Sequence, residues 1–177
     1  DTLRPIMKHA GELALQLRKE GLTSEVKPDG SMVSNADKAV SDFLIAAISA
    51  AYPGDGIVSE ENLDVSGLRA QRTWVIDPID GTKHYINNGP MFAIMVCLFD
   101  EDPVFSVIYH PALRRWYWAE RGKGAYIKDH KRTRRLHLQP PHDPPRIIHG
   151  EECPHKVGTE GGKGIMVNYV YLDGADP

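Results

Sequence analysis

The sequence has few cysteines, no long apolar run and little net charge. Cys97 lies in an apolar segment and Cys153 in a polar one, so the disulfide framework of a small secreted protein is not indicated. No apolar run approaches the roughly 20 residues that a membrane-spanning helix needs. Residues 1–5 lack the apolar region of a signal peptide. With a net charge of -3, the chain also lacks the basic surplus of nucleic-acid-binding proteins. We therefore expect a cytoplasmic protein with a small-molecule partner, and neither a membrane nor a nucleic-acid partner.

Two amphipathic helices are predicted in the first part of the chain. Apolar residues recur at helical spacing over residues 3–20, and Gly21 stands where a helix would end. Ser34 can cap a second helix, with Asp37 three residues further on and an apolar stripe behind it. The residues between them, 27–34, are predicted to form a polar loop.

From residue 56 the pattern changes to short segments rich in β-branched and aromatic residues. Strands are predicted over 56–59, 73–77, 92–100, 104–110, 115–120 and 125–128. Turn residues separate the later segments, which is typical of an antiparallel meander. Two helices on one face of such a sheet make an α+β domain, placed at residues 1–140. The basic run at 131–135 is expected to be an exposed hairpin edge. After a proline-rich linker, residues 146–177 are expected to form part of a second, α/β domain.

Two pairs of acidic residues follow predicted strands. Asp77 and Asp80 follow one strand, and Pro78 between them is expected to stop further strand pairing. Glu60 and Glu61 follow another strand. Burying several carboxylates together is costly unless cations neutralise them, and oxygen ligands favour hard cations such as Mg²⁺. The pattern therefore indicates a magnesium site at these strand ends.

Next to the second aspartate, the sequence also offers an anion site. Gly81 and Thr82 stand at a possible helix start, where backbone N–H groups favour an anion such as phosphate. Each element has a simpler explanation when taken alone: Asp37 as a helix-capping acid, the paired glutamates as solvated surface, and the Asp-Gly pair as a turn. Their occurrence together in one chain is what indicates a functional site.

The order of these segments resembles a known family. Asp37, then Ser59-Glu60-Glu61, then Asp77-Pro78-Ile79-Asp80-Gly81-Thr82, is similar to the pattern of the inositol monophosphatase superfamily, the lithium-sensitive, Mg²⁺-dependent phosphatases of small molecules. The likeness covers about residues 1–138. It implies the layered αβαβα sandwich of the inositol monophosphatase and fructose-1,6-bisphosphatase type, with the second domain incomplete in this chain.

The resemblance implies a set of metal ligands. Glu60, Asp77 and the Ile79 carbonyl would hold one Mg²⁺, and Asp77 with Asp80 a second, in a site of two or three ions. In the family a later Trp-Asp motif completes the second metal site. None of the three tryptophans of this chain is followed by Asp, so we expect a truncated sequence whose last metal ligand is missing.

The resemblance also implies catalytic and phosphate-binding residues. Thr82, paired with Asp37, would orient the attacking water, and Glu60 would act with them. The substrate phosphate would lie against Asp80 and the amides of Gly81 and Thr82. The implied activity is hydrolysis of a small phosphate ester, such as an inositol monophosphate, by metal-activated water.

Several alternatives stay open at this point. The substrate could instead be histidinol phosphate, a 3'(2'),5'-bisphosphate nucleotide or fructose 1,6-bisphosphate, all of which are handled by relatives. A different class of function is a catalytically incomplete fragment that serves as a regulatory binding module. Relatives are commonly dimers, so a homodimer is expected by analogy alone.

Overall fold

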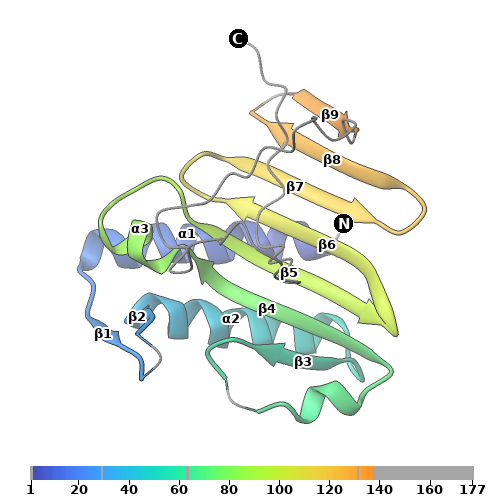
Figure 1. Cartoon of the computed structure of the whole chain (residues 1–177), viewed down its shortest axis with the longest axis horizontal. Coiled ribbons are helices and arrows are strands. Elements are labelled where there is room, and N and C mark those ends of the chain that lie inside the picture. The colour runs from blue at the N-terminus through green and yellow to red at the C-terminus, as the bar shows by residue number, and fades with distance from the viewer. Residues whose placement is uncertain (1, 29, 63, 131, 138–177) are drawn as a thin grey trace, which may run out of the picture. The chain divides into compact units, whose positions relative to one another are not determined.

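The computed structural model describes residues 2–28, 30–62, 64–130 and 132–137 (Figure 1). The chain divides into two units, Asp1–Arg135 and Leu136–Pro177, and the account below concerns the first. The partial domain predicted at 146–177 lies outside the described residues, and the predicted boundary at residue 140 stays a prediction.

A seven-stranded sheet forms the centre of the first unit, in the order β3-β4-β5-β6-β7-β8-β9 (Figure 1). Its strands are β3 (Gly56–Ser59), β4 (Arg72–Asp80), β5 (Ala93–Asp100), β6 (Asp102–His110), β7 (Arg115–Glu120), β8 (Gly124–Asp129) and β9 (Arg132–Leu136). Strand β3 runs parallel to β4, whereas β4 to β8 pair antiparallel with their neighbours. The predicted meander is thus confirmed from β4 onward. Residues 132–135 of the predicted basic run fall on β9, the strand at the edge of the sheet, and residue 131 lies outside the described residues.

Two long helices cover one face of the sheet, α1 (Leu3–Glu20) and α2 (Asn35–Ala51) (Figure 1). Their apolar stripes meet β4, β5 and β6 in one buried core. Its fully or almost fully buried members include Met7, Ala10 and Ala14 of α1, Val40, Leu44 and Ile48 of α2, and Trp74, Ile76, Ile94 and Val96 of the sheet. Both predicted helices and the α+β arrangement are confirmed. Among the described helices, none is long and apolar enough to cross a membrane.

The start of α2 is fixed by the two residues that the sequence indicates. The backbone N–H of Ser34 donates to Asp37 Oδ2 at 2.8 Å, and the Ser34 side chain in turn caps the backbone of the first turn. Such a reciprocal arrangement satisfies donors that a helix start otherwise leaves unpaired. Asp37 is therefore buried at the N-terminal end of α2, with 1% of its surface exposed.

The polar loop predicted at 27–34 is only partly correct. Its last residues form β2 (Met32–Ser34), which pairs antiparallel with β1 (Ser24–Val26) in a short hairpin. The hairpin turn is closed by a hydrogen bond from the Lys27 N–H to the Ser31 carbonyl at 2.8 Å. Three-residue strands show too few alternating positions for the sequence pattern to indicate them.

The prediction that Pro78 stops strand pairing is wrong. Strand β4 continues to Asp80, which pairs with Ala93 of β5. Between Asp77 and Asp80 the register shifts by one residue, which is a β-bulge. A bulge leaves a backbone group outside the ladder, so the missing N–H of proline is tolerated there. A short 3-10 helix, η1 (Ser66–Arg69), lies in the connection from β3 to β4.

Candidate metal and phosphate site

The parallel pairing of β3 and β4 brings Glu60 and Asp77 to the same face of the sheet. Ser59 is the register partner of Ile76. Both point toward the helices, because the Ser59 hydroxyl lies 2.7 Å from that of Ser41 in α2 and Ile76 is buried in the core. Since successive side chains of a strand alternate, Asp77 points to the opposite face. Glu60 directly follows β3, and its side chain lies beside Asp77 because the two share a hydrogen bond. The Glu60 N–H donates to the Ile76 carbonyl at 3.0 Å and keeps this alignment.

The bulge in β4 places Asp80 on the same face as Asp77. In a regular strand, residues three apart would point in opposite directions. Here Asp77 pairs with Met95 and Asp80 with Ala93, so three steps on β4 match two steps on β5. Met95 and Ala93 share one face, and directly paired residues of neighbouring strands share a face too. The extra residue thus converts an odd spacing into a same-face arrangement of two carboxylates.

The two neighbouring carboxylates perturb Asp77 electrostatically. Burial and the neighbouring charges of Glu60 and Asp80 raise the pKa of Asp77 from 3.8 to about 8. The Glu60 side chain also contributes through a hydrogen bond with Asp77. One oxygen, Asp77 Oδ1, is buried without a hydrogen-bond partner. A buried carboxylate of this kind is stabilised by protonation or by a cation.

These residues fit the chemistry of a divalent cation, although they do not form a closed coordination shell. The donors are all oxygens, as hard cations such as Mg²⁺ prefer. Within the described part of the chain, no group of three or more His, Cys, Asp or Glu side chains is arranged to hold a metal ion. The Ile79 carbonyl, predicted as a ligand, accepts a hydrogen bond from the Thr82 hydroxyl at 3.0 Å. The structure therefore brings Glu60, Asp77 and Asp80 together, and their metal binding stays a prediction.

Thr82 and Asp37 meet as the sequence predicted. The Thr82 hydroxyl donates to Asp37 Oδ1 at 3.0 Å, while Asp37 Oδ2 accepts the hydrogen bond from the Ser34 N–H. Burial raises the pKa of Asp37, and its hydrogen bonds from Ser34 and Thr82 oppose that rise. Asp37 is both a helix-capping acid and a partner of Thr82, because its two oxygens serve different donors.

Gly81 forms the turn between β4 and the short helix α3 (Thr82–Ile86). Its backbone is left-handed, with φ 75° and ψ 39°. A Cβ at this position would lie 2.9 Å from the Met91 carbonyl oxygen, so both the conformation and the space require glycine. The predicted helix start after Asp80 is confirmed, although α3 has only five residues.

One residue at this site had no role in the sequence-based prediction. Lys27, on the turn of the β1-β2 hairpin, has its Nζ 2.7 Å from Glu61 Oε1 and 3.5 Å from Glu60 Oε1. Burial acts to lower the pKa of Lys27, but the hydrogen bond and charge of Glu61, together with Glu60, outweigh it and raise the pKa. A lysine in a polar turn gives no sequence pattern that would connect it to a glutamate 33 residues away.

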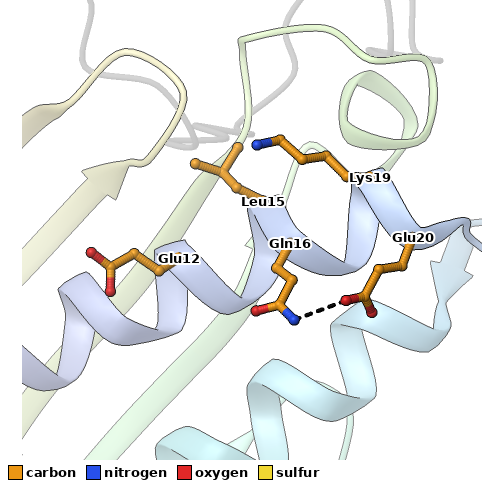
Figure 2. A pocket seen from close by; sticks show the side chains of 5 residues that line it. All are labelled: Glu12, Leu15, Gln16, Lys19 and Glu20. Atoms are coloured by element: carbon orange, nitrogen blue, oxygen red, sulfur yellow. Dashed lines mark hydrogen bonds between the residues drawn. The ribbon is translucent and has the colours of Figure 1, made fainter.

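A surface hollow on α1 lies outside this site (Figure 2). It is lined by Glu12, Leu15, Gln16, Lys19 and Glu20. Gln16 Nε2 donates to Glu20 Oε1 at 2.8 Å across two exposed side chains of the same helix. None of the predicted site residues lines the hollow, so it adds nothing to the carboxylate site.

Comparison with known proteins links this geometry to a family. The sequence profile of the inositol monophosphatase family matches residues 2–160. An inositol-1-monophosphatase from Mesorhizobium japonicum is 36% identical over 113 residues, which cover 63% of this chain and 42% of that protein. A histidinol-phosphatase from Mycobacterium tuberculosis is 38% identical over 117 residues, which cover 65% and 45%. The chain thus spans less than half the length of these two relatives.

A solved structure supports the same assignment. The crystal structure of an IMPase/NADP phosphatase complexed with Mg²⁺ and phosphate superposes with a TM-score of 0.65 at 25% identity, over 73% of this chain and 50% of that one. The similarity therefore extends to the arrangement of helices and strands that carries the carboxylates. On the match over most of its length and on this shared fold, the chain belongs to the inositol monophosphatase family.

Proposed function

We propose that this chain forms the metal- and phosphate-binding part of a Mg²⁺-dependent phosphomonoesterase that hydrolyses a small phosphate ester. The observation that carries the proposal is the Asp77 carboxylate. One of its oxygens is buried without a partner, and Glu60 and Asp80 perturb it from the same face of the sheet. A divalent cation would neutralise these carboxylates and so offset the free-energy cost of burying them together.

Glu60, Asp77, the Ile79 carbonyl and Asp80 are the proposed ligands, in a site of two or three ions. When bound, Mg²⁺ supplies positive charge that lowers the pKa of a water molecule and offsets charge on the phosphoryl group. The Ile79 carbonyl would have to give up its hydrogen bond from Thr82 or share it.

Thr82 and Asp37 are proposed to orient the nucleophilic water. The Thr82 hydroxyl has one proton, which can be donated to Asp37 Oδ1 or to the Ile79 carbonyl, both at 3.0 Å. When this proton is donated to Asp37, the lone pairs of Thr82 Oγ1 are left to accept a proton of the water. Asp37 cannot turn away, since its other oxygen is held by the Ser34 N–H. An oriented water loses less entropy on reaching the transition state.

The substrate phosphate is proposed to lie against Asp80 and the amides of Gly81 and Thr82. The left-handed turn at Gly81 fixes the direction of these two amides relative to β4. Backbone N–H groups at such a turn can bind phosphate oxygens without a charged side chain. Asp80 would face the same phosphate through the metal rather than directly, because two anions repel each other.

An inositol monophosphate is the first substrate to test, and histidinol phosphate is the second. The two relatives described above bear the names of these two activities, at similar identity. A 3'(2'),5'-bisphosphate nucleotide and fructose 1,6-bisphosphate complete the set. Release of inorganic phosphate from each ester, with and without Mg²⁺, distinguishes them.

The deciding variant is Asp77→Asn, with Asp102→Asn as the matched control. Asp102 is an exposed carboxylate on β6 whose only described ion pair is a loose one to Arg121 at 3.8 Å. We expect phosphate release to need Mg²⁺ and to disappear in Asp77→Asn but not in Asp102→Asn. Unchanged hydrolysis by Asp77→Asn would overturn the assignment. Mg²⁺ binding without hydrolysis of any of the four esters would favour the non-catalytic binding module.

A further inference from the structure

Helix α3 carries Thr82 but is too short to be stable without contacts to the rest of the fold. A helix of five residues gains too few hydrogen bonds to offset the cost of forming its first turn. Its conformation must therefore come from contacts with the rest of the fold. The Thr82–Asp37 hydrogen bond is one such contact, and it requires α3 to be in place before it can form.

Tyr85 fastens α3 to the core. Its side chain has no exposed surface, and its hydroxyl donates to the Ala14 carbonyl of α1 at 2.7 Å. Its ring lies edge-on to Phe92, with 4.9 Å between the ring centroids. These contacts fix the middle of α3 against α1 and against Phe92, the residue just before β5, but they do not hold the chain that follows the helix.

Arg18 of α1 holds that following segment. Its Nη1 donates to the Gly89 carbonyl at 2.9 Å. The same guanidinium lies 5.4 Å from the ring centroid of Tyr85 and 5.1 Å from that of Phe92. One side chain thus contacts the helix, the turn after it and the residue just before β5, which a planar cation can do because its edge donates while its face stacks.

The turn after α3 connects the Arg18–Gly89 contact to the helix through two backbone hydrogen bonds. The Gly89 N–H donates to the His84 carbonyl at 2.7 Å, and the Asn88 N–H donates to the Tyr85 carbonyl at 3.1 Å. Gly89 is therefore bonded to α3 through its N–H and to Arg18 through its carbonyl. A displacement of Gly89 would therefore strain the hydrogen bonds at the C-terminal end of α3.

We propose that Arg18 is a positioning residue for the reaction: it holds α3 and its following turn so that Thr82 stays within hydrogen-bonding distance of Asp37. The inference rests on the proposed phosphatase function. The described contacts of Arg18 are with Tyr85, Gly89 and Phe92 and include no residue of the carboxylate cluster, so it would act on Thr82 through them. Loss of its contacts would let α3 move while the sheet and the two long helices keep their core.

Two variants of Arg18 and one matched control test this role. Arg18→Met removes the charge and the donor and keeps much of the side-chain length, and Arg18→Lys keeps the charge without the planar fork. Lys19→Met is the control because Lys19 shares the last turn of α1 with Arg18, so both changes lose the same favourable charge at the helix end. Lys19 is exposed and lies on the hollow shown in Figure 2.

The first measurement is hydrogen exchange of the Tyr85 amide, which donates to the Gly81 carbonyl at 3.0 Å across α3. In the full chain, we expect Arg18→Met to speed exchange at Tyr85 at least tenfold while the amides of β5 keep their wild-type rates. Lys19→Met should change neither. Equal rates at Tyr85 in the two variants, or equal acceleration at every amide, would overturn the proposal.

The second measurement is steady-state kinetics with the ester that the wild-type chain hydrolyses. Misplacing Thr82 should lower kcat about tenfold or more in Arg18→Met with little change in KM, and Arg18→Lys should recover part of the loss. Unchanged kcat alongside faster Tyr85 exchange would overturn the catalytic part of the role. If the wild-type chain hydrolyses none of the esters, the proposed function fails, and the exchange measurement still decides whether Arg18 holds α3.

Discussion

The hydroxyl oxygen of Thr82 lies 3.0 Å from Asp37 Oδ1, although the two residues are 45 positions apart in the sequence. The bond joins the start of α3 to the start of α2, and so links the proposed phosphate-binding turn to a buried helix cap. Asp37 is held from the other side by the Ser34 N–H. The pair is therefore formed and held from both sides before any substrate binds, which is what water positioning requires.

Removing the Thr82 hydroxyl should impair hydrolysis far more than folding. We expect Thr82→Val to lower kcat by about 10²-fold or more, because the water loses its acceptor and Asp37 loses a donor. Thr82→Ser, which keeps the hydroxyl, should retain most of the activity. Steady-state kinetics at saturating Mg²⁺ measure both.

A matched threonine separates this effect from a general loss of a hydrogen bond. The Thr73 hydroxyl, on β4, donates to the Gly67 carbonyl at 2.9 Å, away from the proposed site. Thr73→Val should lower the free energy of unfolding by about 1 kcal/mol and leave kcat unchanged. A comparable loss of kcat in both valine variants would contradict the role of Thr82.

Gly81→Ala should destabilise the chain for two reasons that a second glycine can separate. A Cβ at Gly81 meets the Met91 carbonyl at 2.9 Å, whereas one at Gly122 meets nothing within 4 Å, although both glycines have a φ of +75°. We expect Gly122→Ala to cost about 1 kcal/mol from backbone strain alone, and Gly81→Ala about 1–3 kcal/mol more from the added clash. Urea denaturation measures the free energy of unfolding of both variants. Equal losses would show that the Met91 carbonyl moves aside without cost.

The stability of the metal-free chain should fall as the pH rises. The pKa of Asp77 is raised on folding, from 3.8 to about 8, so the folded state favours its protonated form. The stability that this group contributes is fully present below about pH 4 and is lost as the pH rises through about 8. Asp77→Asn should flatten this part of the profile, and Mg²⁺ should restore stability to the wild type at pH 8. Denaturation in chelator across this range tests it, and parallel profiles for wild type and Asp77→Asn would count against the shift.

Lys27 should weaken Mg²⁺ binding, because its ammonium lies beside the proposed ligand Glu60. Lys27→Met removes a positive charge 3.5 Å from Glu60 Oε1. We expect Mg²⁺ to bind about three- to tenfold more tightly, since an exposed ion pair contributes up to about 1 kcal/mol. Isothermal titration at low salt measures the affinity directly.

Two controls go with this titration. Lys27→Arg keeps the charge and should bind Mg²⁺ as the wild type does. Lys8→Met removes a charge from an exposed pair with Glu12 on α1 and should have no effect. Weaker Mg²⁺ binding in Lys27→Met would mean that Lys27 orients Glu60 and Glu61 rather than competing with the cation.

Much of the fold was predictable because it depends on local spacing. The apolar period of 3–20 and the cap at Ser34 and Asp37 gave both long helices, and turn residues separated the strands from β4 onward. The three-residue strands β1 and β2 and the passage of β4 through Pro78 were not predictable. Their pairing depends on partners elsewhere in the chain. The metal ions, the cytoplasmic location and the homodimer stay predictions.

The sequence by itself determined which residues are candidates for the site, since Glu60, Asp77, Asp80, Gly81 and Thr82 occur in the order of the family pattern. Only the tertiary structure decided how they face one another. Asp80 shares a face with Asp77 because a bulge shifts the register against β5, and the sequence alone does not reveal which residue of a partner strand is skipped. Likewise, the contacts of Lys27 with Glu60 and of Arg18 with Gly89 span 33 and 71 positions. Contacts over such distances arise from packing, not from local pattern.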